Sequence, residues 1–133
     1  MELKFKMNKP VGFIFDYLTD MQKFVFVHPV ISQIDALENN NYLVHETLKF
    51  GFIPFSFTYP VNIESNYENK KIIIRATVMR LTKIEMAFEI RNEGDISIVE
   101  ENIRFKSYLP VKSMMQRIFR EQHTQLFKNI EQL

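Results

Sequence analysis

Apolar and polar residues alternate along most of the chain between residues 41 and 107. This period of two is typical of strands with one buried face, and the short breaks between the segments are typical of an antiparallel meander. We expect five strands here, over 41–50, 54–66, 70–79, 82–91 and 95–107. The same alternation places Leu3, Phe5 and Met7 on one face of a further strand near the N-terminus.

Two other parts of the chain have helical signals. Pro10 is suited to the first turn of a helix and Asp20 to an N-cap, so we expect two short helices over 10–19 and 21–27. In the segment 111–133, apolar residues recur every three or four positions, which indicates one long helix with an apolar face. A helix of this length spans roughly 34 Å and can cross a whole sheet.

Composition excludes several classes of protein. The 133 residues are 46% hydrophobic and 25% charged, which is ordinary for one globular domain spanning 1–133. The three glycines are too far apart for a phosphate-binding loop, there is no cysteine, and the three histidines show no metal-ligand spacing, so we expect no cofactor and no metal. The 17 basic residues balance 16 acidic ones without a basic run, and we expect no nucleic-acid partner.

The N-terminal residues do not form the unbroken apolar stretch of a secretory signal, and no segment approaches 18 consecutive apolar residues. We therefore expect a cytoplasmic protein. Its oligomeric state is left open by the sequence.

Two stretches of sequence resemble a known superfamily. The segment 15–20 (FDYLTD), followed by 27–31 (VHPVI), is similar to the opening of START/Bet v 1-like (SRPBCC, polyketide cyclase/dehydrase-like) domains. The closing strand and helix, from Phe105 to Leu133, resemble the end of these domains, so that the resemblance covers essentially the whole chain. The glycine-rich loop of the plant-allergen members is absent, as are the zinc and iron–sulfur ligands of the oxygenase relatives.

The resemblance implies an α+β helix-grip fold, in which a strand, two helices, five strands and a long helix form a curved antiparallel sheet wrapped around the C-terminal helix. It also implies an elongated cavity, of at least about 300 Å³, that holds a hydrophobic or amphipathic molecule. The apolar residues that we expect to line the cavity are Phe55, Phe57, Tyr59, Ile74, Met86, Phe88, Ile103, Met115 and Phe119. The alternative is that these faces simply pack as a core.

Four polar residues are candidates for contacts with the ligand. Alternation directs Glu46 and Glu101 inward among apolar residues. The alternative is a bulge or register shift that turns one or both to water, which for Glu101 would lie near Ile98. His28 precedes a proline where the short helices should meet the sheet, and Gln122 lies in the apolar stripe of the long helix. Glu101 is our first choice as the anchoring residue, and we expect the neighbouring His123 to be exposed.

The turn 50–55 is unusually apolar for a loop and could be a lid or an entrance, or it could fold back onto the N-terminal helices. Phe52 and Ile53 could contact a membrane, although we do not expect stable attachment. The function that we favour is the binding or carrying of a small hydrophobic molecule, with no catalytic residues required. The alternatives are a protein- or membrane-interaction module with a packed interior, and a cyclase/dehydratase-type enzyme using His28 and a carboxylate.

Overall fold

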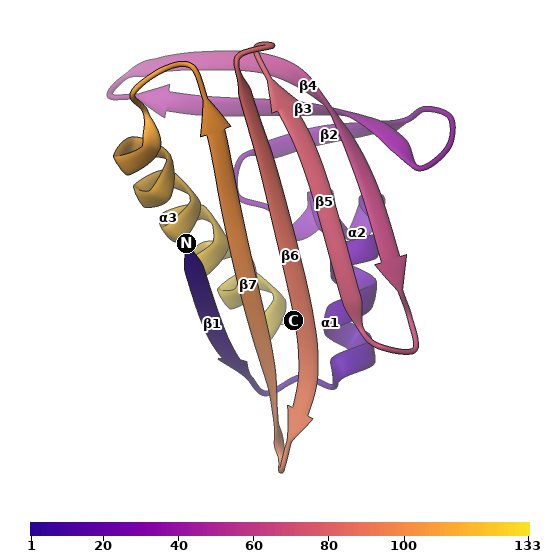
Figure 1. The fold of residues 1–133 in the computed structure, drawn as a ribbon. Coiled ribbons are helices and arrows are strands. Elements are labelled where there is room, and N and C mark those ends of the chain that lie inside the picture. The colour runs from indigo at the N-terminus through magenta and orange to yellow at the C-terminus, as the bar shows by residue number, and fades with distance from the viewer.

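The computed structural model describes the backbone of residues 1–133 and every side chain except that of Phe50. Across these residues the chain forms three helices and a seven-stranded sheet (Figure 1). The elements are β1 (Glu2–Met7), α1 (Val11–Thr19), α2 (Met21–Val27), β2 (Ile31–Ala36), β3 (Asn41–Phe50), β4 (Ile53–Asn66), β5 (Lys71–Val78), β6 (Thr82–Glu93), β7 (Ile96–Ser107) and α3 (Lys112–Glu131).

The sheet is antiparallel throughout, in the order β1-β7-β6-β5-β4-β3-β2. It is so strongly curved that β2, β3 and β4 run across β6 and β7 in Figure 1, with α3 on the same side of the sheet as α1 and α2. This architecture confirms the expected helix-grip fold.

The strand β2 was not expected from the sequence. Its residues Ile31–Ala36 pair with β3, but the register shifts between Ile31 and Gln33. This irregularity removes the strict alternation by which the other strands are recognised. The segment that joins the short helices to the meander is therefore an edge strand.

The two halves of α3 meet the sheet differently. Towards the C-terminus, Leu126, Phe127 and Ile130 are almost completely buried in the core. Towards the N-terminus, Met115 and Phe119 are only partly buried. The helix therefore packs closely on the sheet along its second half and leaves space beneath its first half.

The strand β7 pairs with β1 in a continuous register from Glu2↔Asn102 to Met7↔Ser97. The register with β6 is continuous as well, so Glu101 keeps the inward direction that alternation predicts. The alternative of a bulge near Ile98 is wrong.

Tight turns connect the strands of the meander. Gly51 and Gly94 adopt positive φ in the β3–β4 and β6–β7 turns. Glycine adopts this backbone conformation without steric strain because it has no Cβ atom. The β5–β6 turn instead has Met79 at φ 53° and Arg80 at φ 60°. Such values are unfavourable for residues with long side chains, so this turn is strained. Among the described residues, no helix is long and apolar enough to cross a membrane.

Candidate functional site

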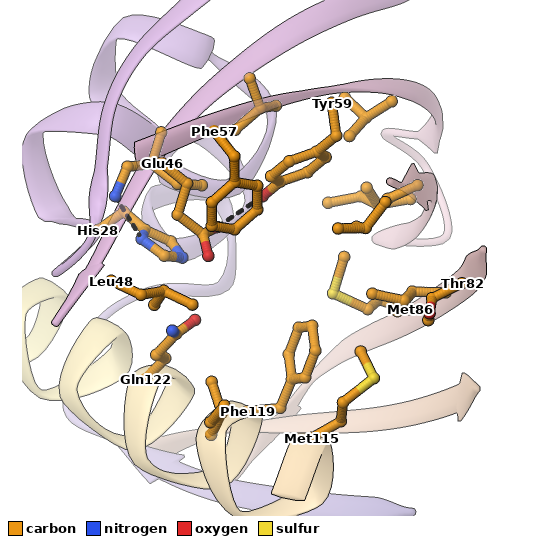
Figure 2. A pocket seen from close by; sticks show the side chains of 18 of the residues that line it. His28, Glu46, Leu48, Phe57, Tyr59, Thr82, Met86, Met115, Phe119 and Gln122 are labelled. Carbon is orange, nitrogen blue, oxygen red and sulfur yellow. Dashed lines mark hydrogen bonds between the residues drawn. The ribbon is translucent and has the colours of Figure 1, made fainter. Parts of the chain in front are cut away.

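A pocket of about 270 Å³ lies between the curved sheet and the first half of α3 (Figure 2). Its volume is slightly below the about 300 Å³ expected from the sequence. The strands β3 and β4 supply one wall, since alternation turns Val44, Glu46 and Leu48 to the same face as Phe57 and Tyr59. The lining is largely apolar.

Most of the residues expected to line a cavity do so. They are His28, Glu46, Phe55, Phe57, Tyr59, Ile74, Met86, Phe88, Met115, Phe119 and Gln122. The two exceptions are Glu101 and Ile103, which are buried but are not part of the pocket wall. Both lie on β7, whose inner face at this level is covered by α3.

Glu101 has a buried partner in place of a ligand. Its Oε1 lies 2.7 Å and its Oε2 2.6 Å from Nδ1 of His123, and the two residues are 2% and 3% exposed. The expectation that His123 is exposed is wrong, because the helix turns it toward the sheet between Phe119 and Leu126. His123 itself reaches the pocket wall, with Glu101 behind it. Glu101 is therefore placed to orient His123 and is screened from the pocket by it.

His28 is held at the end of α2 by its own imidazole. Nδ1 accepts hydrogen bonds from the backbone N–H groups of Val30 and Ile31, both at 3.2 Å. A nitrogen that accepts two hydrogen bonds carries no proton, so the proton of the neutral ring is on Nε2. Burial, and secondarily the nearby His123, lowers the pKa of His28 to about 3. His28 is thus a neutral hydrogen-bond donor near pH 7 and a poor base.

Glu46 is the acidic group of the pocket. The Tyr59 hydroxyl donates a hydrogen bond of 2.7 Å to its Oε1. Burial raises the pKa of Glu46, while the Tyr59 hydrogen bond and the nearby His123 counteract part of this effect. Burial and the adjacent Glu46 carboxylate in turn raise the pKa of Tyr59. The carboxyl group retains a second oxygen with which it could contact a ligand.

The polar groups gather at one end of the pocket. Figure 2 shows the His28 ring, the Glu46 carboxylate and the Gln122 amide directed toward the same space, with the aromatic and methionine side chains beyond them. His28 comes from the end of α2, Glu46 from β3 and Gln122 from α3, so three separate elements converge there. The arrangement suits an apolar molecule with one polar end.

One wall of the pocket was missed in the sequence. It is formed by Met21 and Phe24 of α2 with Ile31 and Ile34 of β2. The spacing of Met21 and Phe24 on one helical face was a usable signal, whereas the bulged β2 gave none.

The β3–β4 turn, the β5–β6 turn and the β7–α3 loop lie at the same end of the sheet (Figure 1). Three residues at this end line the pocket and are also substantially exposed, so the pocket opens here. They are Met79 in the β5–β6 turn, Leu109 in the β7–α3 loop and Met114 near the start of α3. Phe52 and Ile53 are exposed, so the β3–β4 turn does not fold back onto the N-terminal helices. The Phe50 side chain lies outside the described side chains.

No group of His, Asp and Glu side chains in the described part of the chain is arranged to hold a metal ion.

A curved antiparallel sheet, a long C-terminal helix across it and two short helices near the N-terminus define the Bet v 1-like/START (SRPBCC) fold. Comparison with solved structures agrees. The structure of a START superfamily protein from Mycobacterium smegmatis matches with a TM-score of 0.81 and 16% identity, over 98% of this chain and 93% of that one. That of Ara h 8.0201 matches with a TM-score of 0.80 and 14% identity, over 98% and 93%.

A third structure, the di-domain ARO/CYC StfQ from the steffimycin biosynthetic pathway, matches with a TM-score of 0.82 and 10% identity. It covers 98% of this chain and 45% of the larger protein. No protein-family model and no curated protein matches the sequence. At these identities the likeness shows the fold alone.

Proposed function

We propose that the protein binds or carries one small hydrophobic molecule with a polar end, held in the pocket between the sheet and α3. The observation that carries this proposal is the apolar pocket with His28, Glu46 and Gln122 converging at one end. Contacts with apolar walls contribute binding affinity but do not orient a ligand. A few polar groups at defined positions fix its orientation. Met86, Met115 and the aromatic rings make an adaptable wall that suits a ligand of this kind.

The polar end also indicates which groups the ligand carries. His28 offers an Nε2–H donor, Gln122 an amide that donates and accepts, and Glu46 a carboxyl oxygen. A hydroxyl group could donate to Glu46 and accept from His28 or Gln122 at the same time. We therefore propose a neutral alcohol, such as a long-chain or polycyclic one, as the ligand class.

The alternatives have less support. A module with a packed interior leaves unexplained why the first half of α3 stands off the sheet above an apolar space. An enzyme that uses His28 as a base is disfavoured, because Nδ1 accepts two backbone hydrogen bonds and the pKa of the ring is about 3.

Binding can be tested with N-phenyl-1-naphthylamine, a neutral apolar dye whose fluorescence rises in an apolar site. The dye should bind the native protein and lose at least about tenfold in affinity in Met86→Trp, which fills the pocket. The matched control is Leu37→Trp, at an exposed position outside the pocket. Equal affinity in the native protein and both variants, each shown to be folded by circular dichroism, would refute the pocket as the binding site.

The ligand class can be tested by displacing the dye with 1-decanol or with its methyl ether. The alcohol should compete about tenfold better, because only the alcohol can donate a hydrogen bond to the Glu46 carboxyl group. Glu46→Leu should abolish this preference. A preference that persists in Glu46→Leu would show that Glu46 does not recognise the polar end.

A further inference from the structure

The end of the molecule around the pocket opening combines exposed apolar side chains with a local excess of positive charge. Six apolar residues are exposed on the β3–β4 turn, the β5–β6 turn and the β7–α3 loop, and we call this set the rim: Phe52, Ile53, Met79, Leu81, Tyr108 and Leu109. Phe52 is fully exposed. Exposed apolar residues grouped on adjacent loops are typical of an interaction surface.

The charges beside the rim are all of one sign. The segments 47–56, 77–83 and 106–117, which contain the rim, hold no Asp or Glu. They hold six exposed basic residues: Lys49, Arg80, Lys83, Lys106, Lys112 and Arg117. The rest of the chain is left with 11 basic residues against all 16 acidic ones, so a nearly neutral protein is strongly polarised.

These cations are not engaged by the protein itself. Among the described side chains, none of the six lies within ion-pair distance of a carboxylate, whereas Arg75 and Arg91 elsewhere pair with four glutamates between them. Topology explains why they gather. The ends of β3, β5 and β7 and the starts of β4 and β6 meet at one end of an antiparallel sheet (Figure 1). The acidic β6–β7 turn, with Glu93 and Asp95, lies at the opposite end.

We propose that this end of the protein docks reversibly onto the surface of an anionic lipid bilayer. Apolar loop tips can enter the boundary between headgroups and acyl chains while basic residues around them interact with anionic headgroups. The strained β5–β6 turn supplies one apolar and one basic side chain to this surface. Met79 lies on the pocket wall, and Arg80 next to it is exposed. Since two rim residues, Met79 and Leu109, also line the pocket, a docked protein would present this end of its pocket to the bilayer.

The proposal is tested by flotation of the purified protein with vesicles of phosphatidylcholine alone or of phosphatidylcholine with 30% phosphatidylglycerol. We expect binding to the anionic vesicles at low salt, at least about tenfold weaker binding to neutral vesicles, and release by high salt. No binding to the anionic vesicles at low salt would overturn the proposal.

Two pairs of variants test the surface. Phe52→Ser should weaken vesicle binding at least about fivefold, while Phe26→Ser, which removes an exposed phenylalanine from α2, should leave it unchanged. Lys49→Gln/Lys112→Gln should weaken binding about tenfold or more, since each lysine near an anionic surface contributes a factor of about five. The matched control is Lys6→Gln/Lys71→Gln on exposed positions of β1 and β5. Equal losses in test and control variants would overturn the proposal.

Tighter binding to a single- or double-stranded oligonucleotide than to the anionic vesicles would also overturn the membrane proposal, because the basic residues would then serve to bind nucleic acid.

Failure of membrane docking can be distinguished from failure of the proposed ligand binding. Dye binding in the pocket is measured without vesicles, and Phe52 is not among the residues that line the pocket.

Discussion

The imidazole Nδ1 of His123 lies 2.7 Å from the Glu101 carboxylate, and this contact joins α3 to β7 inside an otherwise apolar interior. Two polar residues on different elements, each unfavourable when buried alone, share a hydrogen bond through Oε1 of Glu101, while its Oε2 is buried without a hydrogen-bond partner among the described residues. The contact also fixes the rotation of α3 about its axis, because a turned helix would leave both groups without a partner. The pocket wall on this side is therefore held by a polar contact as well as by packing.

Removing one member of this pair should destabilise the protein. Glu101→Ala leaves His123 buried without its partner, and we expect the free energy of unfolding to fall by about 3 kcal/mol. Urea denaturation measures the loss. The double variant Glu101→Leu/His123→Leu removes both polar groups and should lose less than Glu101→Ala. A single variant as stable as the native protein would contradict the assignment.

His28 should make stability depend on pH. The unfolded chain takes up a proton on this residue near pH 6.5, but the folded protein does so only near 3, where its pKa lies. The free energy of unfolding should therefore decrease as pH falls through this window, with a slope of up to about 1.4 kcal/mol per pH unit from this group. His28→Asn keeps an acceptor for the two backbone N–H groups and does not titrate.

The measurement is urea denaturation of the native protein and His28→Asn at several pH values between about 7 and 4. The variant should show a shallower decline. Glu46, whose pKa is raised by burial, contributes in the opposite direction but is present in both proteins. Parallel curves for the two proteins would show that His28 is not responsible.

Tyr59→Phe should raise the pKa of Glu46 further. The phenolic hydrogen bond lowers this pKa against the effect of burial, and its loss leaves burial less opposed. The change is followed by NMR titration of the Glu46 carboxyl carbon, with Tyr67→Phe at an exposed position as the control. A Glu46 pKa that is unchanged in Tyr59→Phe would mean that the hydrogen bond does not form in solution.

The β5–β6 turn should be improved by residues that favour positive φ. Replacing Met79 and Arg80 by Asn and Gly relieves the strain at both positions, and we expect a gain of about 1–2 kcal/mol. Thermal unfolding should show a higher midpoint. Gly94→Ala, at φ 64°, introduces the same kind of strain elsewhere and should lower the midpoint. If the turn replacement and Gly94→Ala shift the unfolding midpoint in the same direction, the backbone strain at positive φ is not the cause of the change.

Periodicity was sufficient to predict most of the fold. The alternation in β3 to β7 and the spacing of three and four in α3 are long and regular, and they predicted most of the buried positions, although not that of His123. The strand β2 could not be predicted in this way, since it is short, lies at an edge and is bulged at its start. A pattern that depends on regular geometry gives no signal where the geometry is irregular.

The site was predicted in part for the same reason. Alternation placed Glu46 and Glu101 inside, but it could not show that β7 is covered by α3 where Glu101 lies, so that only Glu46 reaches the pocket. His123 was misjudged from its residue type. Its position four residues after Phe119 and three before Leu126 belonged to the buried face, and a second inward polar residue was a suitable partner for Glu101.

The pairing of β1 with β7 has a consequence for how the chain folds. This pairing joins residues 90 to 100 positions apart in the sequence, from Met7↔Ser97 to Glu2↔Asn102, whereas β3 to β7 are connected by local hairpins. Contacts between distant residues require a large loss of chain entropy before they form, and they slow folding. On a ribosome, β1 is synthesised well before β7 and therefore lacks its partner strand until β7 has emerged, and during that interval Leu3, Phe5 and Met7 are exposed to other chains and to chaperones.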